Sequence, residues 1–236
     1  MSRELSADLE QLVSFIKNYN LRGLAENTAI LPIISKIHKK YFSLLALLVE
    51  LNSQDLDNNG FNNNDDCKNY LFESLSDLGN SFFLAFNGGY KASRLMLRSS
   101  IETFVKGISV EELPDITSEK RVYKIFEEAS KISLFSDEPL KSCFNDIKKQ
   151  YSDLCEDTHT ARKSNMQHIS ALNYFPTQDI ANARKISDIF VSLTQSYIFI
   201  ISMKFNQQFH KIHHVNKSNI MKAMKKSNRP VVLNVL

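Results

Sequence analysis

Two histidines and an arginine lie close together in the stretch 151–168. They are His159, Arg162 and His168. A histidine side chain exchanges protons near neutral pH, and an arginine guanidinium can hold a phosphate. Together they could cleave an RNA backbone without a metal, with histidine as the general acid or base. In the alternative interpretation His159 packs at a helix end and Arg162 is solvated, because short spacings of this kind also arise by chance.

The last quarter of the chain is basic. No Asp or Glu follows Asp188, whereas seven positive charges do. The net charge of the chain is +3, so the remainder carries 3 − 7 = −4. This asymmetry favours contact with phosphates or with an acidic partner, although a solvated basic end would look the same. The candidate nucleic-acid-binding residues are Lys211, Lys217, Lys222, Lys225, Lys226 and Arg229.

A third polar group lies on the segment 90–108. Arg94, Arg98 and Glu102 follow one another at steps of four residues, on one edge of an apolar helical stripe. On a central helix such charges would be partly buried and would need partners. Two interpretations stay open: an Arg98–Glu102 ion pair that locks helices together, or a polar pocket inside a bundle.

Two further patterns resemble metal sites, but we expect no metal and no cofactor. The segment 55–66 begins like a calcium loop, with Asp55, Asp57, Asn59 and Gly60 in the required order. Its twelfth position is Asp66, where the longer Glu is usual. His210, His213 and His214 have helical spacing but no acidic or thiol ligand nearby in sequence. A turn-forming polar loop and a basic helix end are the simpler interpretations.

The elements that would position these groups are helices nearly throughout. Apolar residues recur at steps of three and four, and no segment shows a sustained period of two. We expect a helix after Pro32, one ended by Gly88 and Gly89, and one capped by Thr117 or Ser118. A long helix from Thr177 to His214 would span about 57 Å. The expected helical ranges are 5–16, 34–51, 71–86, 90–108, a helix that starts at the cap of Thr117 and Ser118 and runs to 129, 140–154, 177–214 and a short last helix that starts near 216–218 and ends at Pro230.

The predicted fold is therefore all-α, an up-and-down bundle with extra helices at both ends. We expect one domain over residues 1–236, with a basic C-terminal extension at 206–236. Three widely spaced cysteines indicate free thiols, and no apolar run is long enough to span a membrane, so a cytoplasmic location is expected. The chain contains no phosphate-binding glycine loop, His-Glu-x-x-His or nucleophile elbow, which argues against several hydrolase classes.

Residues 68–205 resemble the HEPN-like helical proteins of bacteria. The segment 89–102, Gly-Tyr-Lys-Ala-Ser-Arg-Leu-Met-Leu-Arg-Ser-Ser-Ile-Glu, is similar to their central helix. Arg162 and His168, with five residues between them, resemble the Arg–His pair of HEPN ribonucleases. The resemblance implies a helical bundle, often dimeric, that serves in RNA-targeting toxins and antiphage defence.

Three hypotheses follow. The first is a HEPN-like protein that binds or cleaves RNA, with Arg162 and His168 as the catalytic pair and His159 as an alternative base. The second is a non-catalytic helical adaptor that docks a partner protein. The third is a calcium-responsive protein built around the loop 55–66.

Overall fold

The computed structural model describes residues 27–54, 60–158 and 179–234, with Glu10, Ser14, Asn18, Tyr19 and Pro176. Every regular element in this part of the chain is helical, which confirms the predicted all-α fold. Most of the predicted first helix, at 5–16, lies outside the described residues.

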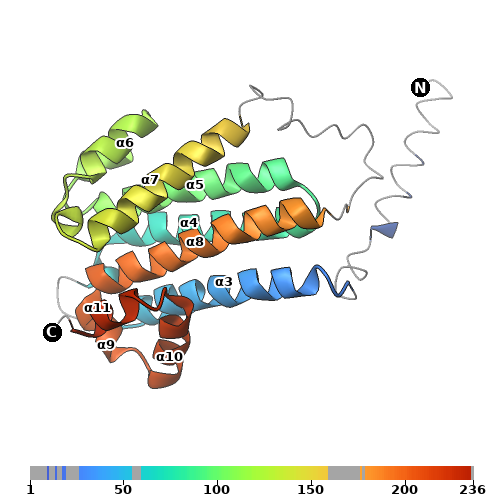
Figure 1. Ribbon diagram of the computed structural model, residues 1–236. Coiled ribbons are helices and arrows are strands. Elements are labelled where there is room, and N and C mark those ends of the chain that lie inside the picture. The colour runs from blue at the N-terminus through green and yellow to red at the C-terminus, as the bar shows by residue number, and fades with distance from the viewer. Residues whose placement is uncertain are drawn as a thin grey trace.

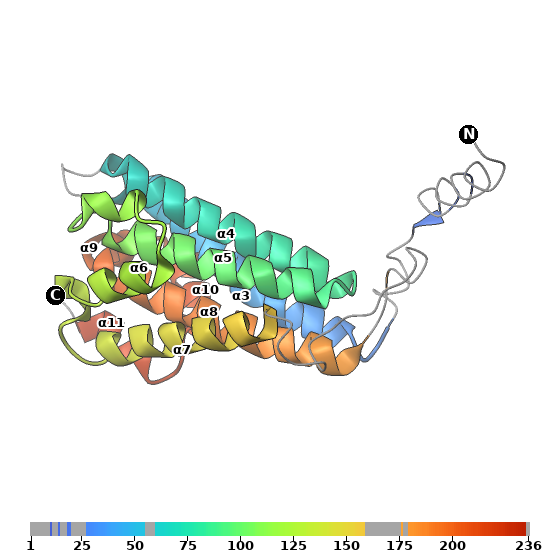
Figure 2. The ribbon, with the colours of Figure 1, turned by 90° about the horizontal axis from the view of Figure 1, so that it is seen from above.

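Five helices of 19 to 25 residues run side by side and form the bundle (Figure 1). They are α3 (Leu31–Asn52), α4 (Asp65–Phe86), α5 (Tyr90–Ser109), α7 (Leu140–Thr158) and α8 (Ile180–Lys204). Shorter elements connect or cap them: η1 (Phe61–Asn63), η2 (Pro114–Thr117), α6 (Val122–Ala129), η3 (Ser133–Phe135), α9 (Asn206–Lys211), α10 (His214–Ala223) and α11 (Asn228–Asn234). Seen from above, α4 and α7 lie at opposite edges of the bundle (Figure 2).

The central helix is α8, which packs against α3, α4, α5 and α7. Thirteen of its 25 residues are buried, including every residue from Ser196 to Ser202. By length and composition α8 could cross a membrane, but 72% of its apolar window is buried by the other helices. From the sequence pattern, residues 90–108 were expected to form the central helix instead. Half of α5 is buried, but Leu95 is exposed, so α5 is apolar on one face only.

α4 and α5 form a close antiparallel hairpin. Gly88 adopts a positive φ of 84°, and the N–H of Gly89 donates to the Leu84 carbonyl at 2.9 Å, which closes α4 in a Schellman turn. The two backbones approach closely because small side chains line the contact. The Ser74 and Ser100 hydroxyls each bond to the other residue's carbonyl, at 2.8 and 3.1 Å.

The long helix predicted to reach His214 ends ten residues earlier, at Lys204. Phe205 leaves helical geometry with φ −109° and ψ 43°, and its side chain is buried in the core. The Asn206 side chain then donates to the Val232 carbonyl at 2.9 Å. These long-range contacts outweigh the helical periodicity that continues through residue 214, so the chain turns into α9.

Two other predicted boundaries were wrong for local reasons. The Thr117 and Ser118 hydroxyls donate to the carbonyls of Pro114 and Asp115, at 3.1 and 2.9 Å, so neither caps α6. Pro230 does not end the last helix, because it lies in the first turn of α11, where a missing N–H costs nothing.

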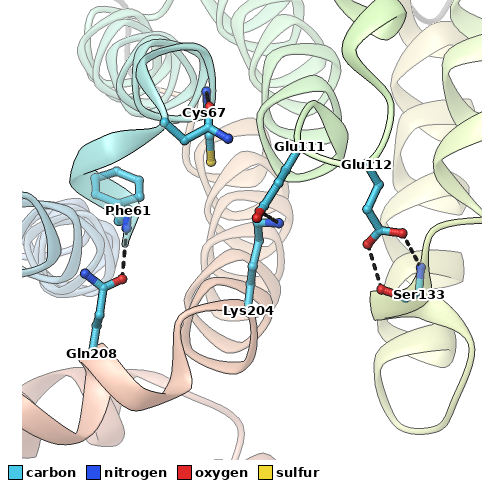
Figure 3. A network of polar contacts seen from close by, with 8 residues as sticks. Phe61, Cys67, Glu111, Glu112, Ser133, Lys204 and Gln208 are labelled. Carbon is cyan, nitrogen blue, oxygen red and sulfur yellow. Dashed lines mark hydrogen bonds and ion pairs between the residues drawn. The ribbon is translucent and has the colours of Figure 1, made fainter. Parts of the chain in front are cut away.

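Helices α9–α11 lie against one end of the bundle (Figure 1). The Gln208 side chain of α9 accepts from the Phe61 N–H at 3.0 Å, and Lys204, the last residue of α8, pairs with Glu111 at 2.7 Å (Figure 3). Cys67 lies near this ion pair, and burial raises the pKa of its thiol to about 12. Helix α10 packs against α3.

Candidate functional site

The three predicted catalytic residues, His159, Arg162 and His168, lie outside the described residues, as do Asp55, Asp57 and Asn59 of the calcium-like loop. Their assignments therefore stay predictions. The described end of that loop has a local role. Asp65 and Asp66 start α4 and suit the positive end of its dipole, and Asp65 pairs with Lys68 at 2.7 Å.

Arg98, Glu102 and Tyr151 form a polar cluster between α5 and α7. The Tyr151 hydroxyl donates to Glu102 Oε1 at 2.7 Å. Arg98 Nε donates both to that hydroxyl, at 3.0 Å, and to Glu102 Oε1, at 3.2 Å. The guanidinium also lies over the Tyr151 ring, 5.3 Å from its centroid. Arg98 and Glu102 are thus paired, as one of the two open interpretations required, and a tyrosine from α7 completes the group.

The electrostatics of this cluster suit structure better than proton transfer. Burial, followed by the hydrogen bond to Glu102, raises the pKa of Tyr151 well above its ordinary value, so the phenol stays protonated. Asp77 of α4 is only 6% exposed, and burial raises the pKa of its carboxyl, with Glu73 and Glu102 adding to the effect and Ser99 opposing it. The cluster holds α5 against α7 and offers no phenolate base near neutral pH.

Arg94 lies one turn before Arg98 but serves a different contact. Its Nη2 donates to Asn182 Oδ1 at 3.2 Å. Asn182 in turn bonds to Asp179, whose carboxylate caps the first turn of α8 by accepting from the Asn182 N–H at 3.1 Å. The three residues predicted as one polar pocket therefore belong to two separate contacts.

Several cations of the basic C-terminal stretch bond to groups within the protein. Lys217 donates to the His210 carbonyl, and Arg229 Nη2 donates to the carbonyls of Lys222 and Met224, at 3.1 and 3.4 Å. Lys225 lies 3.6 Å from Asp146 in an exposed pair, which is worth little. Carbonyls at helix C-termini attract cations, so part of the predicted nucleic-acid surface instead stabilises α9 and α10. Lys211, Lys222 and Lys226 are exposed.

Lys222 faces a groove between α3 and α10, and three lysines of α3 share it. The groove has a volume of about 680 Å³ and is lined by Lys36, Lys39, Lys40 and Lys222, with Ser35 and Asn219 among its polar residues. Lys40 donates to the Ala223 carbonyl at 2.5 Å, which ties α3 to the end of α10. Burial, with the nearby charges of Arg229 and Lys36, lowers the pKa of Lys40. Four lysines therefore line the groove and Arg229 lies beside Lys40, while Lys36 is also paired with the Asp188 carboxylate at 2.8 Å.

Two aromatic rings extend the lining of the groove. His38 and Phe42 are one helical turn apart on α3, with ring centroids 6.2 Å apart and planes inclined by 25°. Both are exposed and line the groove. Sequence reasoning missed these residues and the α3 lysines, although the run Lys36-Ile-His38-Lys39-Lys40 was a visible signal. The run lies more than 180 positions from Lys222, and only the fold brings the two together.

Metal ligands do not converge in the part of the chain that the structure describes. There, no three His, Cys, Asp or Glu side chains lie close enough together to hold an ion. His210 Nε2 lies 3.3 Å from the Val232 carbonyl, and the His213 and His214 rings contact each other, with centroids 4.3 Å apart.

We compared the chain with protein-family models, curated proteins and solved structures. No family model matches this chain, and neither a curated protein nor a solved structure was found to be similar to it.

Proposed function

We propose that this protein binds RNA through the groove between α3 and α10, hereafter the basic groove. The observation that carries the proposal is the gathering of Lys36, Lys39, Lys40 and Lys222 in one groove, with Arg229 beside Lys40. Concentrated positive charge in a concave site focuses the field and attracts polyanions. Lysines in such a groove can neutralise the phosphates of a nucleic acid, which releases the counterions bound to that nucleic acid.

Two of these lysines are available to a ligand. Lys39 and Lys222 are exposed, and neither ammonium group bonds to or pairs with any described residue. Lys40 and Arg229 are already engaged with the carbonyls at the end of α10, so they support the groove and add positive field. We therefore expect Lys39 and Lys222 to contact phosphate, and Lys40 and Arg229 to shape the site.

The choice of RNA rests on the resemblance to HEPN-like proteins over residues 68–205. On that resemblance we extend the proposal to a dimer in toxin or antiphage defence, in which Arg162 and His168 cleave the bound RNA. The adaptor hypothesis is the rival, because an acidic protein surface could also occupy a basic groove.

The test is a binding titration with charge-neutral variants. Lys39→Gln combined with Lys222→Gln should weaken binding of a fluorescent single-stranded RNA and lessen its salt dependence. Two lost phosphate contacts lower the slope of log K against log salt by about 1.4. The matched control is Lys148→Gln combined with Lys149→Gln, which removes the same charge from exposed positions on α7, across α8 from α3 (Figure 1). Equal effects of the two double variants, or no RNA binding at low salt, would leave the adaptor hypothesis ahead.

A further inference from the structure

We propose that Phe42, backed by His38, is a stacking platform by which the basic groove selects nucleic acid with unpaired bases over other polyanions. The inference rests on the proposed function and adds the feature that distinguishes a nucleotide from a bare phosphate chain. Lysines alone cannot supply this selectivity, because they contact phosphates and carry no information about bases.

The exposure of Phe42 is the first step of the argument. Its side chain is 48% exposed, although it lies midway along a helix whose opposite face forms the core. Single exposed apolar residues are common and need no explanation by themselves. Phe42, however, lines the basic groove together with Lys39 and is stacked on His38. A flat apolar surface beside free ammonium groups matches a nucleotide, whose base stacks while its phosphate is neutralised.

The spacing of these residues along α3 suits a short stretch of nucleotides. Phe42 follows Lys39 by three residues, an axial rise of about 4.5 Å, so the ring and the ammonium group lie on neighbouring turns. The groove extends from Pro32 to Ser43, or about 16 Å of helix. Stacked nucleotides advance about 3.4 Å each along one strand, so the groove accommodates a segment of up to about five nucleotides.

A base must be unpaired to use this platform. In a duplex the base faces stack on one another and only their edges reach the grooves. The basic groove is concave, whereas a duplex presents a convex surface of phosphates. The Lys39 and Lys222 ammonium groups would still attract a duplex, but Phe42 would contribute nothing to its binding.

The experiment compares three probes on the full chain: a single-stranded oligoribonucleotide, the same sequence as a duplex, and inorganic polyphosphate of similar charge. Phe42→Ala should weaken binding of the single strand by about fivefold or more, the usual effect of losing one stacked base. Its binding of duplex and polyphosphate should stay within about twofold of the original protein. Phe42→Tyr should restore binding of the single strand, because it keeps the ring.

The matched control is Phe83→Ala on α4, because Phe83 is 53% exposed but does not line the basic groove. An equal loss for all three probes would show that Phe42 only shapes the groove, and the inference would be wrong. Unchanged binding of the single strand would also overturn it, while the Lys39 and Lys222 double variant would still test the proposed function. If the original protein binds none of the probes, both proposals fail together.

Discussion

Removal of one hydroxyl group, by Tyr151→Phe, tests whether the polar cluster between α5 and α7 stabilises the fold. The change deletes the donor to Glu102 at 2.7 Å and the acceptor for Arg98 at 3.0 Å. It keeps the ring, which packs against Phe126 with centroids 5.0 Å apart and lies under the Arg98 guanidinium. The perturbation is therefore confined to hydrogen bonds.

The magnitude follows from the partners and their exposure. Hydrogen bonds to charged groups contribute about 1.5–3 kcal/mol when they are well buried. The side chains of Arg98 and Glu102 are 29% and 30% exposed, so water replaces part of what is lost. We expect the free energy of unfolding to fall by about 1–2 kcal/mol. Glu102→Lys should cost more, about 2–3 kcal/mol, because it also places two cations together.

Urea unfolding measures the effect, and a double-mutant cycle assigns it. Tyr151→Phe and Glu102→Gln should each destabilise the protein without a change in the urea dependence of unfolding. Together they should be less costly than their sum, by about 1 kcal/mol, because the two residues share a hydrogen bond. Glu128→Gln is the reference, since both side chains of its pair with Lys131 are exposed. A loss below about 0.5 kcal/mol for Tyr151→Phe, or full additivity, would refute this reasoning.

Two further predictions concern a buried acid and the catalytic hypothesis. Because the pKa of Asp77 is raised in the folded protein, the free energy of unfolding falls as the pH rises above the ordinary Asp value, near 4. Asp77→Asn should therefore raise the free energy of unfolding at pH 7 and lose that advantage near pH 4, as measured by urea titrations. An advantage of the same size at both pH values would contradict this. RNA cleavage, if present, should persist in chelator and leave 2′,3′-cyclic phosphate ends, and both His168→Ala and Arg162→Ala should slow it, by about 10²–10⁴-fold where proton transfer is lost. Loss of activity in His159→Ala with an intact His168→Ala would move the general base to His159.

The secondary structure was largely readable from the sequence, because its signals are local. Apolar steps of three and four residues identified α3, α4, α5 and α7, and Gly88 and Gly89 marked the turn between α4 and α5. The same periodicity gave a wrong end for α8. It continues past Lys204, whereas burial of Phe205 and the bond from Asn206 to Val232 turn the chain there.

The roles of the charged residues, in contrast, were not readable from the sequence. The acid-free tail was obvious from composition, but composition counts charges without showing what they face. Lys217 and Arg229 bond to helix-terminal carbonyls, a role set by the packing of α9–α11. Lys222 instead faces the lysines of α3, more than 180 positions away in the chain. The sequence by itself determined the helices and the excess of basic residues. Only the tertiary structure decided which cations form the basic groove, because that depends on which helix surfaces are buried against each other.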